Sequence, residues 1–286
     1  MDREQTLLML SERPELVHTF PDSLLSSKVI DELKNSHGVA IAEVAGRDSI
    51  AAVIVAVKQY PIKKVLPTIA FTGTEFGKWE TTIEKSRLLA KKLRRHNVKV
   101  FDPLFLGSPK FWWLLAGRYI SSLFHQFGFY TPCLGCHLYL HAIRIPLAKR
   151  VGAPYIISGE RERHDGRVKL NQITAALNAY ENFVQEFDVH LLFPLRYISS
   201  GEEIEKIIGQ TWEEGREQLQ CVLSKNYQDI NGTISYNEGD VSKFFNEFAI
   251  PVAKKIIRDY LNGLRPDYEA FQQGSFPQIK LTKSAG

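Results

Sequence analysis

The chain has three cysteines, and two of them, Cys133 and Cys136, form a Cys-x-x-Cys sequence. The third, Cys221, lies far downstream. Thiol groups at the Cys-x-x-Cys spacing can bind a metal ion, hold an iron-sulfur cluster or form a redox-active disulfide. The spacing alone leaves all three chemistries open.

A second candidate for chemistry is the sequence Ala45-Gly46-Arg47-Asp48-Ser49, which lies between an apolar run and a predicted helix. Small residues let backbone N–H groups approach a phosphate, and a helix N-terminus attracts anions. Arg47 adds positive charge, and Asp48 is a candidate ligand for Mg²⁺. An ordinary helix-capping turn with Asp48 or Ser49 as the cap explains the same residues, so both interpretations stay open.

Alternating apolar and amphipathic segments must position these groups. Strands are predicted at residues 39–44, 65–71, 98–101, 154–158 and 189–195. Helices are predicted at 26–35, 50–57, 79–95, 109–127, 137–150 and 170–187. Strands that alternate with helices predict an α/β fold, with a parallel five-stranded, Rossmann-like sheet and helices on both faces. Ligands bind such sheets at the carboxyl ends of the strands, where the loop from Ala45 to Ser49 falls.

The pattern divides the chain into four regions. Residues 1–36 form an N-terminal helical lead, and residues 37–199 form the predicted nucleotide-binding α/β domain. Residues 200–271 are predicted to form a small helical C-terminal appendage, with helices at 202–209, 212–224 and 241–264. The tail at 272–286 is predicted to be disordered.

The composition limits the choice of function class. With 286 residues, 44% of them hydrophobic, the chain can bury a large core. A formal charge of +4 suits an anionic ligand but does not demand nucleic acid. Three cysteines do not make a disulfide framework, and the sequence from Met1 to Gln5 lacks the start of a secretory signal. The most apolar stretch is interrupted by charge at Arg118, so we expect a cytoplasmic protein with no membrane span.

The sequence Val44-Ala45-Gly46-Arg47-Asp48-Ser49 resembles the Ser-Gly-Gly-x-Asp-Ser loop of the PP-loop ATP pyrophosphatase superfamily, the adenine nucleotide α-hydrolase-like proteins. Val44 and Ala45 depart from that pattern. Gly159 and Asp165 lie where relatives carry a Gly-His-x-x-Asp-Asp-like element, with Glu160 in place of the histidine. The resemblance runs from the loop through Leu195, about half of the chain, and implies a HUP-type fold.

Two branches of this superfamily resemble other parts of the chain. The sequence Phe71-Thr72-Gly73-Thr74-Glu75-Phe76 is similar to the Asp-Thr-Gly-x-x-Phe stretch of phosphoadenylylsulfate reductase, but the C-terminal Cys-Gly pair of that reductase is absent. In the iron-sulfur tRNA thiolation enzymes, such as the tRNA 2-thiocytidine synthetase type, a Cys-x-x-Cys and one distant cysteine hold a [4Fe-4S] cluster. Cys133, Cys136 and Cys221 match that arrangement in order.

The resemblance implies an ATP-dependent sulfurtransferase that adenylates its substrate and handles sulfur at a [4Fe-4S] cluster. It implies catalytic roles for Asp48 and for the three cysteines. The three cysteines are also the implied metal ligands. The implied nucleotide and Mg²⁺ contacts are Ala45, Gly46, Arg47, Asp48, Ser49, Thr72, Gly159 and Asp165. The implied partners are a nucleotide substrate, tRNA or a small-molecule sulfur acceptor, a sulfur donor and, as an option, a second copy of the chain.

Other interpretations remain open. Zinc could occupy the cysteine pair with His137 or His141 as a further ligand. The pair could also be a thioredoxin-like dithiol, and Cys221 could be a buried apolar residue in a helix with Leu219, Val222 and Leu223. A PP-loop enzyme could instead act on a small molecule or remove sulfur. A nucleotide-binding protein with a structural zinc and no sulfur transfer is the alternative outside sulfur chemistry.

Overall fold

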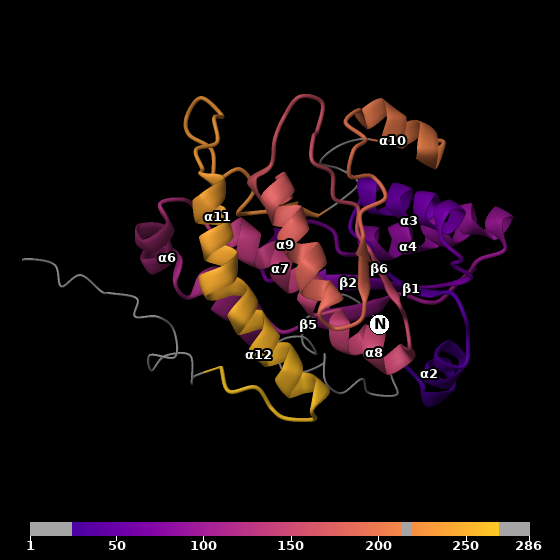
Figure 1. The fold of residues 1–286 in the computed structure, drawn as a ribbon. Helices are drawn as coiled ribbons and strands as arrows, with labels where there is room; N and C mark the ends of the chain where they lie inside the picture. Colours follow the sequence, from indigo (N-terminus) through magenta and orange to yellow (C-terminus); the bar gives the residue numbers. More distant parts are fainter. Residues whose placement is uncertain (1–24, 213–218, 269–286) are drawn as a thin grey trace, which may run out of the picture.

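The computed structural model describes residues 25–212 and 219–268, and its centre is a six-stranded sheet (Figure 1). The strand order is β4-β2-β1-β6-β7, with β5 also paired to β2, and every pair in this sheet is parallel. The strands are β1 (Val39–Glu43), β2 (Lys64–Phe71), β4 (Lys99–Val100), β5 (Leu104–Gly107), β6 (Tyr155–Ile157) and β7 (His190–Leu192). The predicted parallel α/β fold is confirmed.

The sequence-based prediction missed one strand of this sheet, β5. It pairs with the second half of β2, from Thr68 to Phe71, while the shorter β4 pairs with the first half. One eight-residue strand thus has two successive partners on the same side. The strands β4 and β5 are separated by the sequence Phe101-Asp102-Pro103, which is typical of a loop.

Helices cover both faces of the sheet, as predicted. Because side chains alternate along a strand, Ala40 and Ala42 of β1 join one apolar core while Val39 and Ile41 join the other. The first core contains α3 (Arg47–Gln59), α4 (Glu80–Leu93) and α10 (Gly201–Ile208). The second contains α2 (Ser27–Lys34), α5 (Pro109–Trp112), α6 (Ile120–Phe127), α7 (Pro132–Ala142), α8 (Ile145–Val151), α9 (Thr174–Gln185), α11 (Glu238–Phe244) and α12 (Ile250–Leu261).

Two long predicted helices are divided in the structure. The segment 109–127 comprises α5, a π-helical turn at Trp113–Gly117 and α6. The helix predicted from residue 137 begins earlier, at Pro132, and is two helices, α7 and α8. Both cysteines of the pair therefore lie in the first turns of α7. A Cβ on Gly135 would lie 2.2 Å from the Leu115 carbonyl oxygen, so the glycine lets α7 pack directly on the π-helical turn.

The helix predicted at 212–224 is wrong for its described part, because Gln220–Cys221 forms a short strand, β8. It pairs antiparallel with β3 (Glu75–Phe76), a contact across the fold that local sequence does not encode. Residues 213–218 of that predicted helix, residues 1–24 of the N-terminal lead and the predicted tail 272–286 lie outside the described residues.

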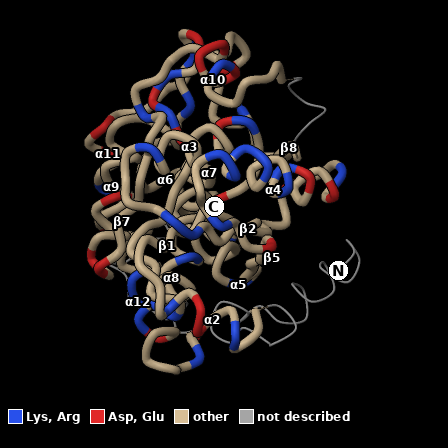
Figure 2. The backbone as a smooth tube through the Cα atoms, turned by 90° about the vertical axis from the view of Figure 1, so that its right-hand side faces the viewer, with Lys and Arg blue, Asp and Glu red and all other residues tan. Residues whose placement is uncertain are grey.

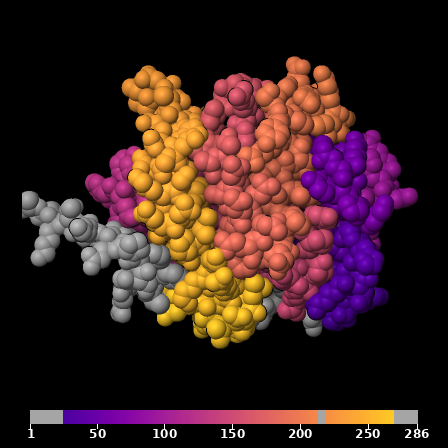
Figure 3. All heavy atoms as spheres, viewed as in Figure 1, coloured from indigo at the N-terminus to yellow at the C-terminus, as the bar shows by residue number. Residues whose placement is uncertain are grey.

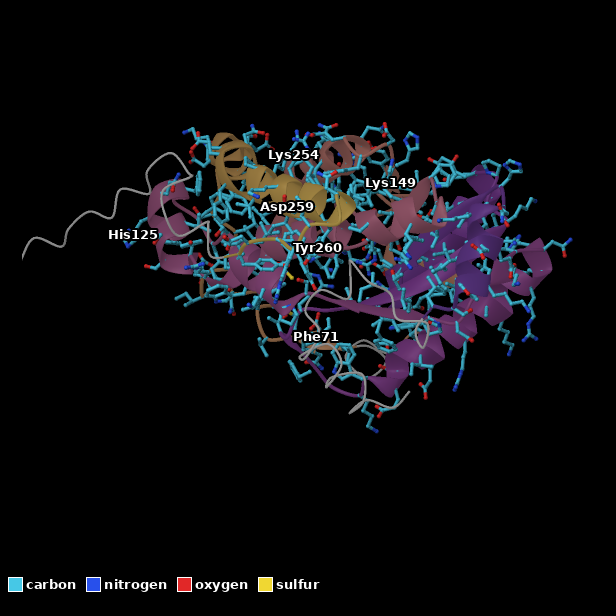
Figure 4. All side chains as sticks on the ribbon, turned by 90° about the horizontal axis from the view of Figure 1, so that it is seen from below. Phe71, His125, Lys149, Lys254, Asp259 and Tyr260 are labelled. Carbon is cyan, nitrogen blue, oxygen red and sulfur yellow. The ribbon has the colours of Figure 1, made fainter. Side chains whose placement is uncertain are left out.

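The helices after residue 200 pack on the α/β core. The α10 helix contacts α3, and α12 contacts α7 and α8. Figure 3 shows α11 and α12 lying along the face of the molecule beside the central segments. Tyr260 of α12, labelled in Figure 4, has its hydroxyl 3.4 Å from the Oγ of Ser108, which follows β5. The division at residue 200 stays a prediction.

The elements in Figure 2 carry Lys and Arg residues interspersed with Asp and Glu residues, in keeping with the small net charge. Within the described part of the chain, no helix combines the length and apolarity needed to cross a membrane.

Candidate active site

One cavity of about 510 Å³ is lined by nearly all of the predicted site residues. It lies at the carboxyl ends of β1 and β6. Its lining includes the whole predicted phosphate loop, the three cysteines and two residues after β6, namely Ala45, Gly46, Arg47, Asp48, Ser49, Cys133, Cys136, Cys221, Gly159 and Asp165. Thr72 is the exception. It is buried outside this cavity, where its hydroxyl bonds to Thr74.

Cys221 reaches the cavity because β8 pairs with β3, which places Cys221 opposite Glu75. The Oγ1 of Thr74 lies 3.4 Å from the Cys221 Sγ, and the backbone N–H of Leu223 donates to that sulfur over 3.4 Å. The Cys133 Sγ donates to the Leu223 carbonyl oxygen at 3.7 Å. The segment that carries Cys221 is therefore joined directly to the segment that carries the pair.

The environment of the pair favours protonated thiols over thiolates. Burial, with a smaller contribution from Cys221, raises the pKa of Cys133 to about 12. Burial also raises the pKa of Cys136. A redox-active dithiol needs a lowered thiol pKa, so this environment disfavours the thioredoxin-like interpretation. A positively charged metal centre would supply the charge that thiolates require here.

The side chains near the cysteines bear on the choice between one zinc ion and an iron-sulfur cluster. Within residues 25–212 and 219–268, no three His, Cys, Asp or Glu side chains converge as ligands of one ion. A four-iron cluster is larger than one ion, so its ligands need not approach each other as closely. The buried indole N–H of Trp112 makes no hydrogen bond of good geometry among the described residues, but it lies close enough to the Cys136 sulfur to favour its thiolate. Hydrogen bonds of that kind stabilise cluster sulfurs.

The two histidines proposed as zinc ligands contact side chains other than the cysteines. The Nδ1 of His141 lies 2.8 Å from Glu43 Oε1, and its Nε2 lies 3.4 Å from Glu160 Oε1. The Nδ1 of His137 bonds to the same Glu160 oxygen, and its Nε2 lies 2.8 Å from the side-chain nitrogen of Asn171. Both rings thus face polar groups other than the cysteines.

The loop before α3 is closed on itself by Ser49. Its Oγ accepts the backbone N–H groups of Ala45 at 3.0 Å and Gly46 at 3.1 Å, and donates to the Gly46 carbonyl at 2.7 Å. These hydrogen bonds are typical of a helix-capping turn. They occupy the backbone N–H groups of Ala45 and Gly46, which in the phosphate-binding interpretation would point toward the phosphate. The N–H groups of the first turn of α3 remain as the donors that a helix N-terminus offers an anion.

Asp48 anchors this loop to the segment after β6. Its Oδ1 accepts from Arg47 Nε at 2.9 Å, and its Oδ2 accepts from Arg161 Nε at 2.8 Å. Burial opposes ionisation of Asp48, but the charges of Arg161 and Arg47 outweigh it and lower the pKa. With both oxygens on guanidinium groups, Asp48 is poorly placed as a Mg²⁺ ligand. Asp165, whose Oδ1 accepts the backbone N–H of Gly201 at 2.9 Å, is the better candidate among the described residues.

Gly159 is needed for packing. A Cβ at this position would lie 2.5 Å from Ser49 N and 2.6 Å from Asp48 C, so the backbone after β6 approaches the loop more closely than any side chain permits.

We therefore predict that Gly159→Ala destabilises the protein by about 1–3 kcal/mol, because it overpacks this contact, and weakens nucleotide binding by displacing the loop. Urea unfolding and titration with a fluorescent ATP analogue measure the two effects. Gly166→Ala is the control, since nothing lies within 4 Å of its Cβ and only the positive φ of +83° is strained. Equal ATP-analogue affinity in the Gly159→Ala variant and the wild type would contradict the prediction.

The sequence-based prediction missed a buried network on the cavity floor. It consists of Glu43, His141, Glu160 and His137, with Arg144 at 3.5 Å from Glu43. Burial opposes ionisation of Glu160, but His137 and His141 lower its pKa to about 2. The signal in the sequence was the i, i+4 spacing of His137 and His141 on α7, directly after the cysteine pair.

This network makes stability depend on pH. Burial disfavours the charged form of His141, but Glu43 and Glu160 outweigh it and raise its pKa from 6.5 to about 9. A raised pKa stabilises the fold fully below pH 6.5, and this contribution is lost as pH rises through 9. We expect the free energy of unfolding to fall by roughly 3 kcal/mol over that window. Urea titrations at a series of pH values measure the decline.

The variant His141→Gln should remove most of that decline, while His190→Gln, at an exposed position on β7, should retain it. An unchanged slope in His141→Gln would show that another group is responsible.

The parallel sheet and the cavity at its carboxyl edge define a Rossmann-like α/β protein. The chain is 42% identical over 227 residues to the uncharacterised protein MJ0009 of Methanocaldococcus jannaschii, covering 79% of this chain and 82% of that protein. It therefore belongs to the same family as MJ0009. No known protein-family profile matches the chain.

Two solved structures are similar to this chain in part. One is a 4-thiouridine synthetase in complex with RNA and ATP, with 15% identity, a TM-score of 0.47, and coverage of 79% of this chain and 53% of that one. The chain thus spans about half of that enzyme's length. The other is the U34-tRNA thiolase NcsA from Methanococcus maripaludis with its [4Fe-4S] cluster, with 13% identity, a TM-score of 0.34, and coverage of 94% and 80%. At these scores neither likeness supports a function.

Proposed function

We propose that this chain is an ATP-dependent sulfur-transfer enzyme of the PP-loop class that acts on tRNA or on a small molecule. The observation that supports this most strongly is that one cavity is lined both by the Ala45–Ser49 loop and by Cys133, Cys136 and Cys221. ATP chemistry and sulfur chemistry can therefore meet without a moving carrier.

In the proposed reaction, an oxygen of the acceptor substrate attacks the α-phosphorus of ATP and pyrophosphate leaves. Sulfur then adds at the activated carbon and AMP departs with the oxygen. The chain supplies binding and orientation through the N-terminus of α3 and the cations of the lining, Arg47, Arg161, Arg167, Lys169 and Lys225. Asp165 is the residue we assign to Mg²⁺.

The three cysteines would hold a [4Fe-4S] cluster. Three protein ligands leave one iron open, and that position can bind sulfide or a substrate sulfur. Trp112 would hydrogen-bond to the sulfur of Cys136, and the apolar residues around the pair would exclude water. A reducing cytoplasm suits such a site.

Anaerobic purification followed by iron, sulfide and zinc counting, absorption spectroscopy and ATP-binding measurements tests the proposal. We expect about four iron and four sulfide per chain and saturable ATP binding in the same preparation. A colourless protein with stoichiometric zinc and no iron would overturn sulfur transfer and favour a nucleotide-binding protein with a structural zinc. If the protein releases sulfide from a thiolated nucleoside but does not form the thiolated nucleoside, the reaction is sulfur removal.

A further inference from the structure

The sulfur of Cys221 lies within reach of two hydrogen-bond donors. The backbone N–H of Leu223 donates to it over 3.4 Å, and the Thr74 hydroxyl oxygen lies 3.4 Å away. The sulfur of Cys133 faces the Leu223 carbonyl instead, which is an acceptor. A thiolate accepts hydrogen bonds and donates none. The surroundings of Cys221 therefore suit a deprotonated sulfur.

The Thr74 side chain is held in place by the turn that carries it. Thr74 is 7% exposed and Thr72 is 4% exposed, and their hydroxyl oxygens lie 2.7 Å apart. The Thr72 oxygen also accepts the backbone N–H of Thr74 at 3.2 Å, and the Thr72 N–H donates to Glu75 Oε2 at 3.2 Å. The backbone N–H of Val222 donates to the Thr74 carbonyl at 3.0 Å. The turn is thus built directly against the segment that carries Cys221.

The direction of the Thr74 hydroxyl follows from the acceptors within its reach. One is the Thr72 oxygen, which already accepts the N–H of Thr74, and the other is the Cys221 sulfur. A thiol that binds a metal is deprotonated. A charged sulfur then competes better for the donor than a neutral hydroxyl does. In the metal-loaded protein the Thr74 O–H therefore points to Cys221, and the Thr72 O–H can donate to Thr74.

We propose that Thr74 is a positioning residue that donates its hydroxyl hydrogen bond to the Cys221 thiolate, holding the third sulfur ligand and raising the reduction potential of the cluster. This inference rests on the proposed function, because it takes the three cysteines as the cluster ligands. It assigns the Phe71–Phe76 stretch to the cysteine half of the cavity instead of the nucleotide half. Reduction adds negative charge to a cluster and its ligands, so a donated hydrogen bond is stronger in the reduced state.

The variant Thr74→Val removes the hydroxyl and keeps a side chain of similar shape. We expect its reduction equilibrium to shift at least about threefold toward the oxidised cluster, which is about 30 mV for a one-electron couple. Thr74→Ser restores the hydroxyl and should keep the wild-type potential. A dithionite titration of the anaerobically purified full-length protein, followed by EPR spectroscopy, measures the shift. Thr74→Ala also lacks the hydroxyl and gives the same test if the valine variant does not fold.

Thr82→Val is the matched control. Thr82 is 1% exposed, and its hydroxyl donates to the Trp79 carbonyl at 2.6 Å, so the variant loses a buried hydrogen bond that involves no sulfur. It should keep the wild-type potential. An unchanged potential in Thr74→Val, the same shift in Thr74→Ser, or the same shift in Thr82→Val would each overturn the inference.

Binding of Co²⁺ to the metal-free, full-length protein separates this inference from the proposed function, because the measurement needs neither iron nor ATP. We expect Co²⁺ affinity to fall at least about tenfold in Thr74→Val and to be retained in Thr74→Ser. A wild-type protein purified with zinc and no iron would overturn sulfur transfer, and the Co²⁺ comparison would still report on Thr74. Equal Co²⁺ affinity in Thr74→Val and the wild type, with weaker binding of an ATP analogue, would assign the turn to the nucleotide and overturn the inference.

Discussion

Replacing Cys221 with alanine is expected to lower the iron bound to anaerobically purified protein at least about tenfold, because even the loss of a group that only supports a ligand costs about that much in metal affinity. The physical reason is geometric. Cys221 is the only cysteine outside α7, and β8 brings it to the cavity that Cys133 and Cys136 line. Two thiolates on one helix cannot enclose a cluster from a second side. Iron and sulfide assays with absorption spectra measure the loss.

Ser224→Ala is the matched control, because Ser224 lines the same cavity three residues after Cys221 and has no thiol. It should retain its iron. Affinity for an ATP analogue should change little in both variants, since the nucleotide loop is carried by β1 and α3. Full iron content in Cys221→Ala would remove Cys221 from the ligand set and leave the pair with another partner.

The sheet could be predicted because its strands are short apolar runs bounded by polar loops. Buried parallel strands need apolar residues on both faces, and the segment Val39–Glu43 shows that pattern directly. Leu104–Gly107 was missed because four residues after a proline do not distinguish a strand from a loop. Its identity as a strand depends on pairing with β2, which is a long-range contact.

The residues of the candidate site could be predicted from their types, but the geometry of the site could not. Cys221 was assigned to a helix because Leu219, Val222 and Leu223 suggest a helical apolar face. Pairing with Glu75 overrides that local preference. Ser49 and Asp48 were predicted either to bind a nucleotide or to cap the helix, and in the structure both hold the loop. The roles of Glu160 and His141 could not be read from the sequence, because their partners come from three different elements.

Asp48→Ala is expected to destabilise the protein by about 3–5 kcal/mol, because it leaves a buried guanidinium without its counterion. Arg161 is 1% exposed and donates to the carbonyls of Ile198 and Ser199 as well as to Asp48. Those carbonyls solvate the cation but carry no full charge to balance it. Urea unfolding of the full chain measures the change.

The double variant Asp48→Ala/Arg161→Leu distinguishes an ion-pair role from a general loss of packing. Removing both charges eliminates the unpaired cation, so the double variant should be more stable than Asp48→Ala alone, giving a coupling free energy of at least about 1 kcal/mol. Glu162→Ala, which leaves Arg196 with a second carboxylate partner in Glu181 at 3.5 Å, should cost less than Asp48→Ala. Strictly additive effects at Asp48 and Arg161 would contradict the ion-pair account. If affinity for an ATP analogue is also lost in the double variant, despite its recovered stability, then the loop needs the guanidinium for nucleotide binding and not only for folding.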